Sequence, residues 1–233
     1  MRLRRKLHRL TPSLAHVDSW LFDLDNTLYP AECDLFALID ERMGLYLQRL
    51  LDCDAAEARR VQKDYFYNHG TTLAGLMAQH TIDPHEFLDF VHDISMDRIT
   101  PNPALKAHID ALPGRKLIYT NGDAPYAQRV LDALGLSDSF EGIFDIVASD
   151  LIPKPAAISY AMLCEAHNIA PKSAFFADDM ARNLRPAKAL GMATLWINNG
   201  SEQAETNADH DHIDHRADCL TKWLGNLHIQ ELT

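Results

Sequence analysis

The sequence predicts an α/β fold, in which a Rossmann-like parallel sheet core carries an inserted helical cap domain. Two observations predict it. Short apolar segments recur along the chain and alternate with helical patterns, as in a doubly wound sheet. A long stretch between the first two apolar segments contains helical patterns only, which indicates an insertion. We therefore expect a core formed by residues 17–30 and 105–233, and a helical cap formed by residues 31–104.

The expected strands are short apolar segments with the β-rich content of buried parallel strands. They are residues 17–24, 116–120, 144–149, 174–178 and 193–198. The helices expected between them have typical terminal residues: residues 124–134 precede Gly135, residues 155–168 begin with proline, and residues 182–190 precede Gly191. A last helix is expected over residues 217–227.

The expected cap consists of four helical patterns. Apolar residues recur at helical spacing over residues 35–50, and further patterns cover residues 55–67, 72–80 and 84–94. Pro101 and Pro103 are predicted to close this helical region. Because the insertion starts directly after the first strand, we expect it to lie over the end of the sheet as a lid.

Composition limits the possible partners and the location. The 233 residues are 47% hydrophobic, enough for a sizeable core, and carry a formal net charge of -11, which argues against a nucleic acid polymer as partner. No apolar stretch reaches the roughly 18 residues of a membrane span. The basic residues 1–9 have no apolar region behind them, and the four cysteines form no CxxC pair. We expect a cytoplasmic protein with free thiols, a monomer or a homodimer.

The first expected strand ends in two carboxylates, Asp23 and Asp25. Their spacing points both side chains to the same side of an extended segment. Two like charges held so close are costly unless a cation or a shared proton offsets them. Oxygen ligands suit Mg2+, so the pair predicts metal-assisted chemistry at the end of a strand.

The other expected strands also end in polar groups. Ligands of an open α/β sheet bind beyond the carboxyl ends of its strands, so these groups should meet. They are Thr120 with Asn121 and Gly122 after the second strand, Lys154 after the third, and Asp178 with Asp179 at the end of the fourth. Each has an ordinary structural explanation by itself, such as a surface lysine or a helix-capping aspartate. Their joint occurrence in this order favours one site.

Charge suggests a role for each group. Asp23 is a candidate nucleophile that could form an acyl phosphate, and Asp25 could protonate the leaving alcohol and then deprotonate water. Lys154 could offset the charge of two approaching anions. Thr120 and the amides of Asn121 and Gly122 could hold phosphate oxygens. Asp178, with Asp179 or Asn183 behind it, could complete a Mg2+ shell through direct and water-bridged contacts.

These motifs resemble those of the haloacid dehalogenase-like hydrolase superfamily. The matching residues are Asp23-Leu24-Asp25-Asn26-Thr27, Thr120, Lys154 and the pair Asp178-Asp179. The resemblance implies a Rossmann-like core with a helical cap, an aspartyl-phosphate intermediate, and Mg2+ held by Asp23, the backbone carbonyl of Asp25 and Asp178, with Asp179 behind them or bridged to the metal by water. Dehalogenase members of the superfamily lack the second acid, so Asp25 favours phosphate-ester hydrolysis.

Three stretches resemble the pyrimidine 5'-nucleotidase branch of the superfamily: residues 25–30, 69–76 and 175–183. This resemblance implies a nucleoside monophosphate substrate such as UMP or CMP. A phosphatase for another small metabolite, such as a sugar phosphate or phosphoglycolate, is the alternative, and a non-catalytic binding module is a more distant one.

Substrate choice is expected in the cap, because the cap would cover the leaving group. Tyr29, His69, Thr71 and Thr72 are candidates to contact base or ribose. In the alternative interpretation Tyr29 packs at the cap hinge, and the two threonines cap the helix that follows. The polar tail contains His210, His212 and His215, whose spacing allows metal binding, but we expect residues 201–216 to form a solvated loop.

Overall fold

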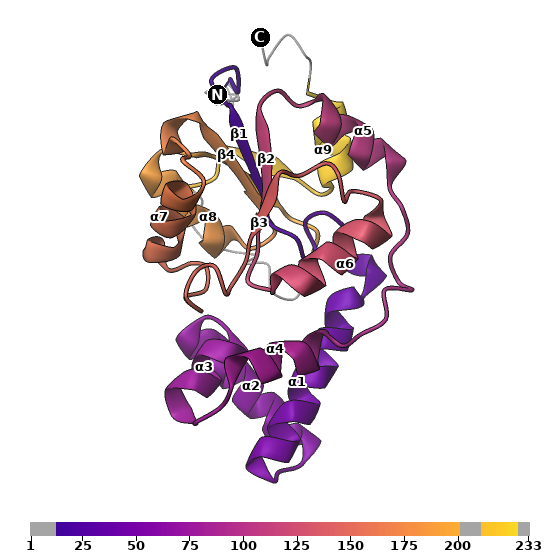
Figure 1. Cartoon of the computed structure of the whole chain (residues 1–233), viewed down its shortest axis with the longest axis vertical. Helices are drawn as coiled ribbons and strands as arrows, with labels where there is room; N and C mark the ends of the chain where they lie inside the picture. Colours follow the sequence, from indigo (N-terminus) through magenta and orange to yellow (C-terminus); the bar gives the residue numbers. More distant parts are fainter. Residues whose placement is uncertain (1–12, 201–210, 228–233) are drawn as a thin grey trace, which may run out of the picture.

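A six-stranded parallel sheet with the strand order β3-β2-β1-β4-β5-β6 forms the centre of the computed structural model, which describes residues 13–200 and 211–227 (Figure 1). Every neighbouring pair of strands is parallel. The strands are β1 (Ser19–Phe22), β2 (Arg115–Tyr119), β3 (Gly142–Phe144), β4 (Ala174–Asp178), β5 (Ala193–Ile197) and β6 (His215–Ala217). The predicted Rossmann-like α/β core is therefore confirmed.

Helices cover both faces of the sheet. Helices α7 (Ala157–Ala166) and α8 (Ala181–Leu190) lie on one face, and α5 (Pro103–Ala111), α6 (Ala124–Leu134) and α9 (Leu220–Gly225) lie on the other (Figure 1). Successive side chains of a strand point to opposite faces. Accordingly, Trp20 and Phe22 of β1 belong to the apolar cluster on the α5, α6 and α9 side, and Leu21 belongs to the cluster with α7 and α8.

The expected strands differ from the structure in two places. The third was predicted over residues 144–149, but β3 ends at Phe144 and the chain turns at Asp145. The side chain of Asp145 accepts hydrogen bonds from the backbone N–H groups of Ala124 and Ala148, and these bonds favour a turn over a strand. Strand β6 was not predicted, because three residues are too few to show a periodicity.

The chain returns to the sheet through a helix that the sequence did not predict. Pro103 was expected to close the helical region, but it occupies the first turn of α5. The side chain of Asn102 caps this helix by accepting from the N–H of Leu105 at 3.0 Å. Proline is tolerated in the first turn because its missing N–H would have no helical partner there.

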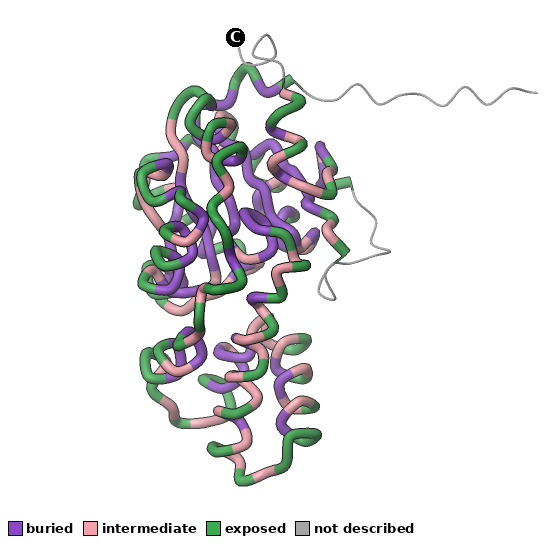
Figure 2. Tube along the Cα trace, turned by 90° about the vertical axis from the view of Figure 1, so that its right-hand side faces the viewer, coloured by how far each residue is buried: buried purple, intermediate pink, exposed green. Residues whose placement is uncertain are grey.

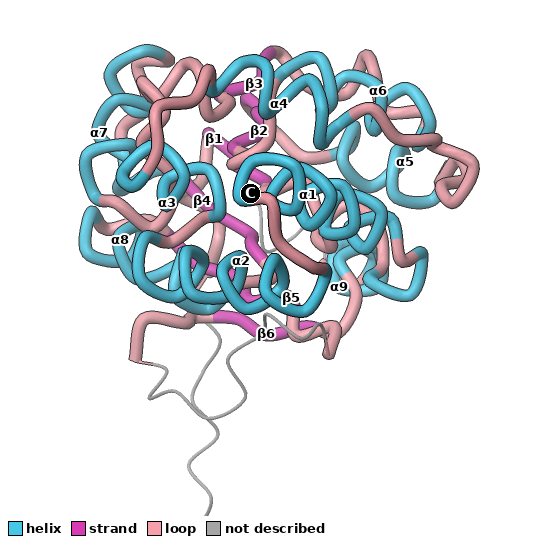
Figure 3. The backbone as a smooth tube through the Cα atoms, turned by 90° about the horizontal axis from the view of Figure 1, so that it is seen from below, coloured by secondary structure: helices cyan, strands magenta, loops and turns pink. Residues whose placement is uncertain are grey.

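Four helices follow β1 and lie beyond the carboxyl ends of the strands (Figures 1 and 3). They are α1 (Leu35–Leu51), α2 (Ala55–His69), α3 (Thr72–Gln79) and α4 (Pro84–His92). Short 3-10 helices at Ala31–Cys33 and Pro171–Ser173 complete the helical content of the described chain. We call α1–α4 the cap helices. The residue boundaries between core and cap given above stay a prediction.

Buried residues concentrate in the strands and on the inner sides of the helices (Figure 2). The expectation of a solvated loop over residues 201–216 is wrong for its last part. His212 and His215 are buried; the ring of His212 pairs with the carbonyl oxygen of Ala181 at 2.8 Å, and His215 belongs to β6. His210, most of that loop and the basic residues 1–9 lie outside the described residues.

Within the described part of the chain, no helix combines the length and the apolar character that crossing a membrane requires.

Candidate active site

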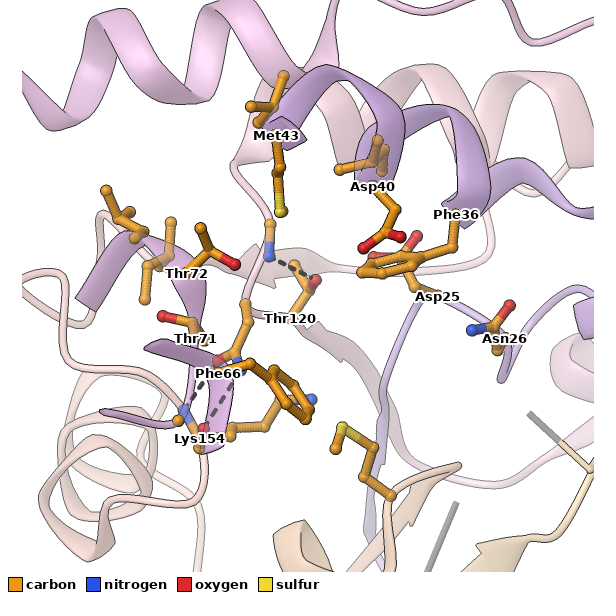
Figure 4. Close-up of a pocket in the computed structure, with 18 of the residues that line it drawn as sticks. Asp25, Asn26, Phe36, Asp40, Met43, Phe66, Thr71, Thr72, Thr120 and Lys154 are labelled. Carbon is orange, nitrogen blue, oxygen red and sulfur yellow. Dashed lines mark hydrogen bonds between the residues drawn. The ribbon is translucent and has the colours of Figure 1, made fainter. Parts of the chain in front are cut away.

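The predicted site residues meet at the carboxyl ends of three adjacent strands. Asp23 follows β1, Thr120 follows β2 and Asp178 ends β4, while Lys154 lies in the loop before α7. A pocket with about 1060 Å³ of empty space, its open mouth included, extends from these strand ends into the cap helices (Figure 4). Strand ends and cap helices therefore line one cavity.

Lys154 links two of the aspartates. Its side chain is buried, and Nζ donates to Asp23 Oδ1 at 2.7 Å, to Asp178 Oδ2 at 2.8 Å and to the carbonyl oxygen of Tyr119 at 2.9 Å. Burial disfavours the ammonium, but the charges of Asp178 and Asp23 outweigh it and raise the pKa of Lys154. Lys154 is therefore a fixed cation at the point where a phosphoryl group would meet Asp23.

Asp23 is held on both sides of its carboxylate. Its Oδ2 accepts a hydrogen bond from Thr27 Oγ1 at 2.9 Å, and its backbone N–H donates to the carbonyl oxygen of Ala177 at 2.9 Å. These contacts, together with Lys154, fix the side chain in one orientation at the wall of the pocket. A preorganised carboxylate with an adjacent cation suits a nucleophile.

Asp25 is held by two tyrosines. Tyr29 and Tyr126 donate their hydroxyl hydrogens to the same oxygen, Asp25 Oδ1, at 2.5 and 2.6 Å. The structure thus gives Tyr29, expected to contact base or ribose, a different partner; it is buried and does not line the pocket. Asp25 Oδ2 accepts no hydrogen bond from any residue that the structure describes. It is therefore the oxygen left for a ligand.

The surroundings of Asp25 favour its protonated form. Burial and then the charge of Asp23 raise the pKa of Asp25, while the hydrogen bonds from Tyr126 and Tyr29 partly oppose the rise. Burial, followed by the charge of Asp25, also raises the pKa of both tyrosines, so they remain donors. The ring of Tyr126 stacks on that of His92 from α4, at 4.4 Å between centroids. A cap residue thus packs against the group that orients Asp25.

The second strand end is already hydrogen bonded. The N–H of Gly122 donates to Thr120 Oγ1 at 2.9 Å (Figure 4). The side chain of Asn121 accepts from the N–H of Lys154 at 2.8 Å and donates to its carbonyl oxygen at 3.3 Å. Asn121 therefore fixes the lysine loop, and the Thr120 hydroxyl keeps its hydrogen for a ligand. Phosphate binding by Thr120, Asn121 and Gly122 stays a prediction.

Three carboxylates form a cluster that could hold a cation. Oxygen atoms of Asp23, Asp178 and Asp179 lie within 4.8 Å of one another, and all three residues are buried. Burial raises the pKa of Asp179 and of Asp178, and the neighbouring carboxylate charges add to the rise. Together these aspartates carry more negative charge than Lys154 offsets, which is the situation that a divalent cation relieves.

Asn183 supports this fit. Its Nδ2 donates to both oxygens of Asp178 at 3.0 Å, which leaves the carbonyl oxygen Oδ1 buried and without a hydrogen bond to any described residue. Buried acceptors normally have a partner. An all-oxygen cluster beside an unpartnered acceptor suits Mg2+, which prefers carboxylates and usually retains several waters that can donate hydrogen bonds.

The cap contributes two of the residues predicted from the sequence. Thr71 and Thr72 line the pocket, and Thr71 also caps α3 by accepting from the N–H of Ala74 at 3.1 Å. His69 does not line the pocket; its ring contacts that of Tyr65.

Sequence reasoning missed further pocket residues on the cap helices. They include Phe36, Asp40, Met43, Gln62, Phe66, Phe87 and His92. The apolar ones obey the same helical periodicity as core residues, so periodicity alone does not single them out. Gln62 left no distinctive signal either, because several other polar residues occur within the same helical pattern of residues 55–67.

Comparison with known proteins agrees with this geometry. Residues 17–191 match the family model of the haloacid dehalogenase-like (HAD) hydrolases. The chain belongs to this family. The matched region includes every strand end that contributes to the acidic cluster and Lys154, and it also includes the cap helices.

Two curated relatives of this HAD hydrolase differ in their names. Phosphate metabolism protein 8 of Saccharomyces cerevisiae is 26% identical over 211 residues, which cover 83% of this chain and 66% of the relative. The (S)-2-haloacid dehalogenase of Xanthobacter autotrophicus is 26% identical over 126 residues, 53% of this chain and 49% of the relative. This chain thus spans between about half and two thirds of their lengths.

Solved structures show the same fold. A HAD phosphatase from Thermococcus onnurineus matches with a TM-score of 0.59 at 20% identity, covering 89% of this chain and 96% of its own. The L-2-haloacid dehalogenase of Xanthobacter autotrophicus matches with a TM-score of 0.55 at 19% identity, covering 90% and 97%. The HAD-hydrolase YfnB from Bacillus subtilis, solved bound to magnesium, matches with a TM-score of 0.56 at 14% identity, covering 91% and 99%.

Proposed function

We propose that this HAD hydrolase is a Mg2+-dependent phosphomonoesterase that acts through an aspartyl-phosphate intermediate. The observation that carries the proposal is the position of Asp25, oriented by two tyrosines at the wall of the pocket that Asp23 also lines. A halide leaves without a proton, whereas an alkoxide needs one. A held second acid therefore supports ester hydrolysis over dehalogenation. The name of the yeast relative agrees with this choice.

The residues divide the reaction into two steps. In the first, a carboxylate oxygen of Asp23 attacks the phosphorus, the bond to the ester oxygen breaks, and that oxygen takes the proton of Asp25. In the second, Asp25 takes a proton from water, the resulting hydroxide attacks the phosphorus, and the bond to Asp23 breaks. Lys154 and the Thr120 hydroxyl would bind the phosphoryl oxygens that face Asp23.

Asp23, Asp178, Asp179 and the backbone carbonyl of Asp25 would hold Mg2+. When bound, the cation would neutralise the phosphoryl oxygens and the clustered carboxylates. Every proton transfer described above stays with Asp25.

The proposed substrate is a pyrimidine nucleoside monophosphate such as UMP or CMP. Aromatic side chains line the cap side of the pocket: Phe36, Phe66 and Phe87. They support a leaving group that carries a flat base. A sugar phosphate or phosphoglycolate offers no flat aromatic ring to contact them. A cytoplasmic location, and a monomeric or homodimeric state, stay predictions.

Phosphate release from UMP, CMP, ribose 5-phosphate and phosphoglycolate, with and without Mg2+, tests the proposal. Halide release from 2-chloropropionate serves as the comparison. We expect release from UMP and CMP that depends on Mg2+, and no halide release. Similar turnover of all four phosphates would remove the nucleotidase assignment and leave a general phosphatase.

The variant Asp23→Asn tests the nucleophile. We expect a loss of turnover of at least about 1,000-fold with the fold intact, since a covalent route needs this carboxylate. Asp18→Asn is the matched control, because Asp18 is an exposed aspartate next to the other end of β1. Residual activity within about tenfold of the wild type, a barrier change of only about 1.4 kcal/mol, would refute the assignment.

A further inference from the structure

The cap side of the pocket contains a glutamine whose amide is held in one orientation. Gln62 of α2 is only 3% exposed. Its Nε2 donates to Asp40 Oδ1 at 2.7 Å, and the backbone oxygen of Asp40 and the sulfur of Met43 lie at 3.5 and 3.6 Å. A carboxylate accepts hydrogen bonds only, so the NH2 group must face Asp40. Arg59 pairs with the other carboxylate oxygen and so fixes Asp40 as well.

The opposite side of this amide lacks a partner. Gln62 lines the pocket, and its carbonyl oxygen Oε1 accepts no hydrogen bond from any residue within 13–200 or 211–227. This oxygen is not among the fully buried atoms that lack a hydrogen bond, so it is open to the pocket, where a ligand that displaces water must replace the hydrogen bond it lost. Because Asp40 keeps the amide from rotating, the donor comes from inside the pocket, from water in the free protein or from a bound ligand.

The remaining walls around this acceptor are mostly apolar. The aromatic rings of Phe36, Phe66 and Phe87 line the cavity. The guanidinium of Arg182 lies over the ring of Phe66 at 4.4 Å and donates to the carbonyl oxygen of Gly70 at 3.0 Å, which ties this wall to α8 of the core. Aromatic walls favour a flat ring, which can stack on them or contact their edges.

We infer that the leaving group is a nucleoside whose heteroaromatic base has an N–H donor on its edge, and that Gln62 Oε1 accepts this hydrogen bond. The inference rests on the proposed function and makes Gln62 a specificity-determining residue of the same pocket. Uracil offers N3–H, and cytosine offers its 4-amino group. A base whose donor is methylated still fills the apolar walls but leaves Gln62 unpaired.

A comparison of substrates tests the inference on the wild-type protein. The values of kcat/KM are measured with Mg2+ for UMP and 3-methyluridine 5'-monophosphate, and for CMP and its N4,N4-dimethyl derivative. We expect each methylated substrate to lose about tenfold or more, because a site built around a hydrogen bond rejects a ligand that lacks the donor. A loss below about twofold for both pairs overturns the inference.

The variant Gln62→Met separates the lost hydrogen bond from the bulk of the added methyl group. Methionine has a similar size but provides no amide acceptor. We expect kcat/KM for UMP to fall about tenfold, the discrimination against the methylated base to shrink by a similar factor, and ribose 5-phosphate turnover to stay within about twofold. Gln48→Met is the matched control, because Gln48 lies on α1, bonds to the carbonyl oxygen of Gly44 and does not line the pocket.

The outcomes distinguish this inference from the proposed function. If neither base methylation nor Gln62→Met changes nucleotide turnover, the role of Gln62 is overturned and the proposed nucleotidase activity still stands. Turnover of ribose 5-phosphate that equals or exceeds that of every nucleotide overturns both. Thermal unfolding shows whether Gln62→Met folds; if it does not, the wild-type comparison alone decides.

Discussion

Replacing Tyr126 by phenylalanine removes one of the two hydroxyl groups that orient Asp25. Both hydroxyls bind the same oxygen, at 2.6 Å from Tyr126 and 2.5 Å from Tyr29, and direct the other oxygen to the pocket. A hydrogen bond to a charged group contributes about 1.5–3 kcal/mol, and this range applies as Asp25 gives up its proton and becomes charged. If half of the lower value is lost, the rate of the step that Asp25 catalyses falls severalfold. If the whole hydrogen-bond contribution is lost, the rate falls by about 10- to 100-fold.

We therefore expect Tyr126→Phe to lower kcat/KM for UMP by about 10- to 100-fold. The double variant with Tyr29→Phe should approach Asp25→Asn, whose expected loss is the roughly 10²–10⁴-fold that general acid catalysis contributes. The decisive readout is leaving-group dependence. 4-Nitrophenolate leaves without a proton, so kcat/KM for 4-nitrophenyl phosphate should fall by less than about threefold.

Tyr65→Phe provides the matched control. It removes a hydroxyl that bonds to the ring of His80 at 2.7 Å, in the cap and away from the pocket wall. An orienting role of the two tyrosines is contradicted if the double variant hydrolyses UMP within about threefold of the wild type, or if the kcat/KM values for UMP and 4-nitrophenyl phosphate fall equally. Equal losses would show that the tyrosines support the fold of the site and do not orient the acid.

Two further predictions concern the charges of the site. Lys154→Met removes the ammonium that pairs with Asp23 and Asp178, so we expect urea unfolding without Mg2+ to show a loss of about 3–5 kcal/mol at neutral pH. Removing Lys154 raises the pKa of Asp178 further, so the loss in free energy of unfolding should be smaller at pH 5 than at pH 8. An equal loss at both pH values would contradict the pairing of Lys154 with an ionised Asp178. Asp179→Asn should raise the melting temperature of the metal-free protein at neutral pH, because burial and then Asp23 raise the pKa of Asp179 and its ionisation opposes folding there. An acid whose folded pKa is raised stabilises the fold below its unfolded pKa and loses that contribution as pH rises. The gain in melting temperature of Asp179→Asn should therefore shrink toward pH 4. It should also disappear when Mg2+ binds and stabilises the wild type.

The reactive groups could be found in the sequence because they follow strands directly. Asp23, Thr120 and Asp178 each come within one residue of the end of an apolar segment, and parallel strands bring their carboxyl ends to one edge. The Thr120 hydroxyl and the side chain of Asn121, in contrast, showed their local partners only in the structure.

Element boundaries failed where short polar contacts outweighed the apolar pattern. The capping side chain of Asn102 turned an expected helix-closing proline into the start of α5, and Asp145 ended β3 early. Such side-chain to backbone hydrogen bonds depend on which N–H groups are near, and the periodicity of apolar residues carries no information about them.

The sheet, the helical insertion and the order of the reactive groups can be predicted from the sequence, because alternation and spacing are local properties of the chain. Which helical side chains complete the site depends on how the elements pack in three dimensions. Tyr126 lies 101 positions from Asp25 along the chain, and Gln62 lies 22 positions from its partner Asp40. No local pattern encodes such pairs; packing the helices against the sheet and against each other brings them within hydrogen-bond distance.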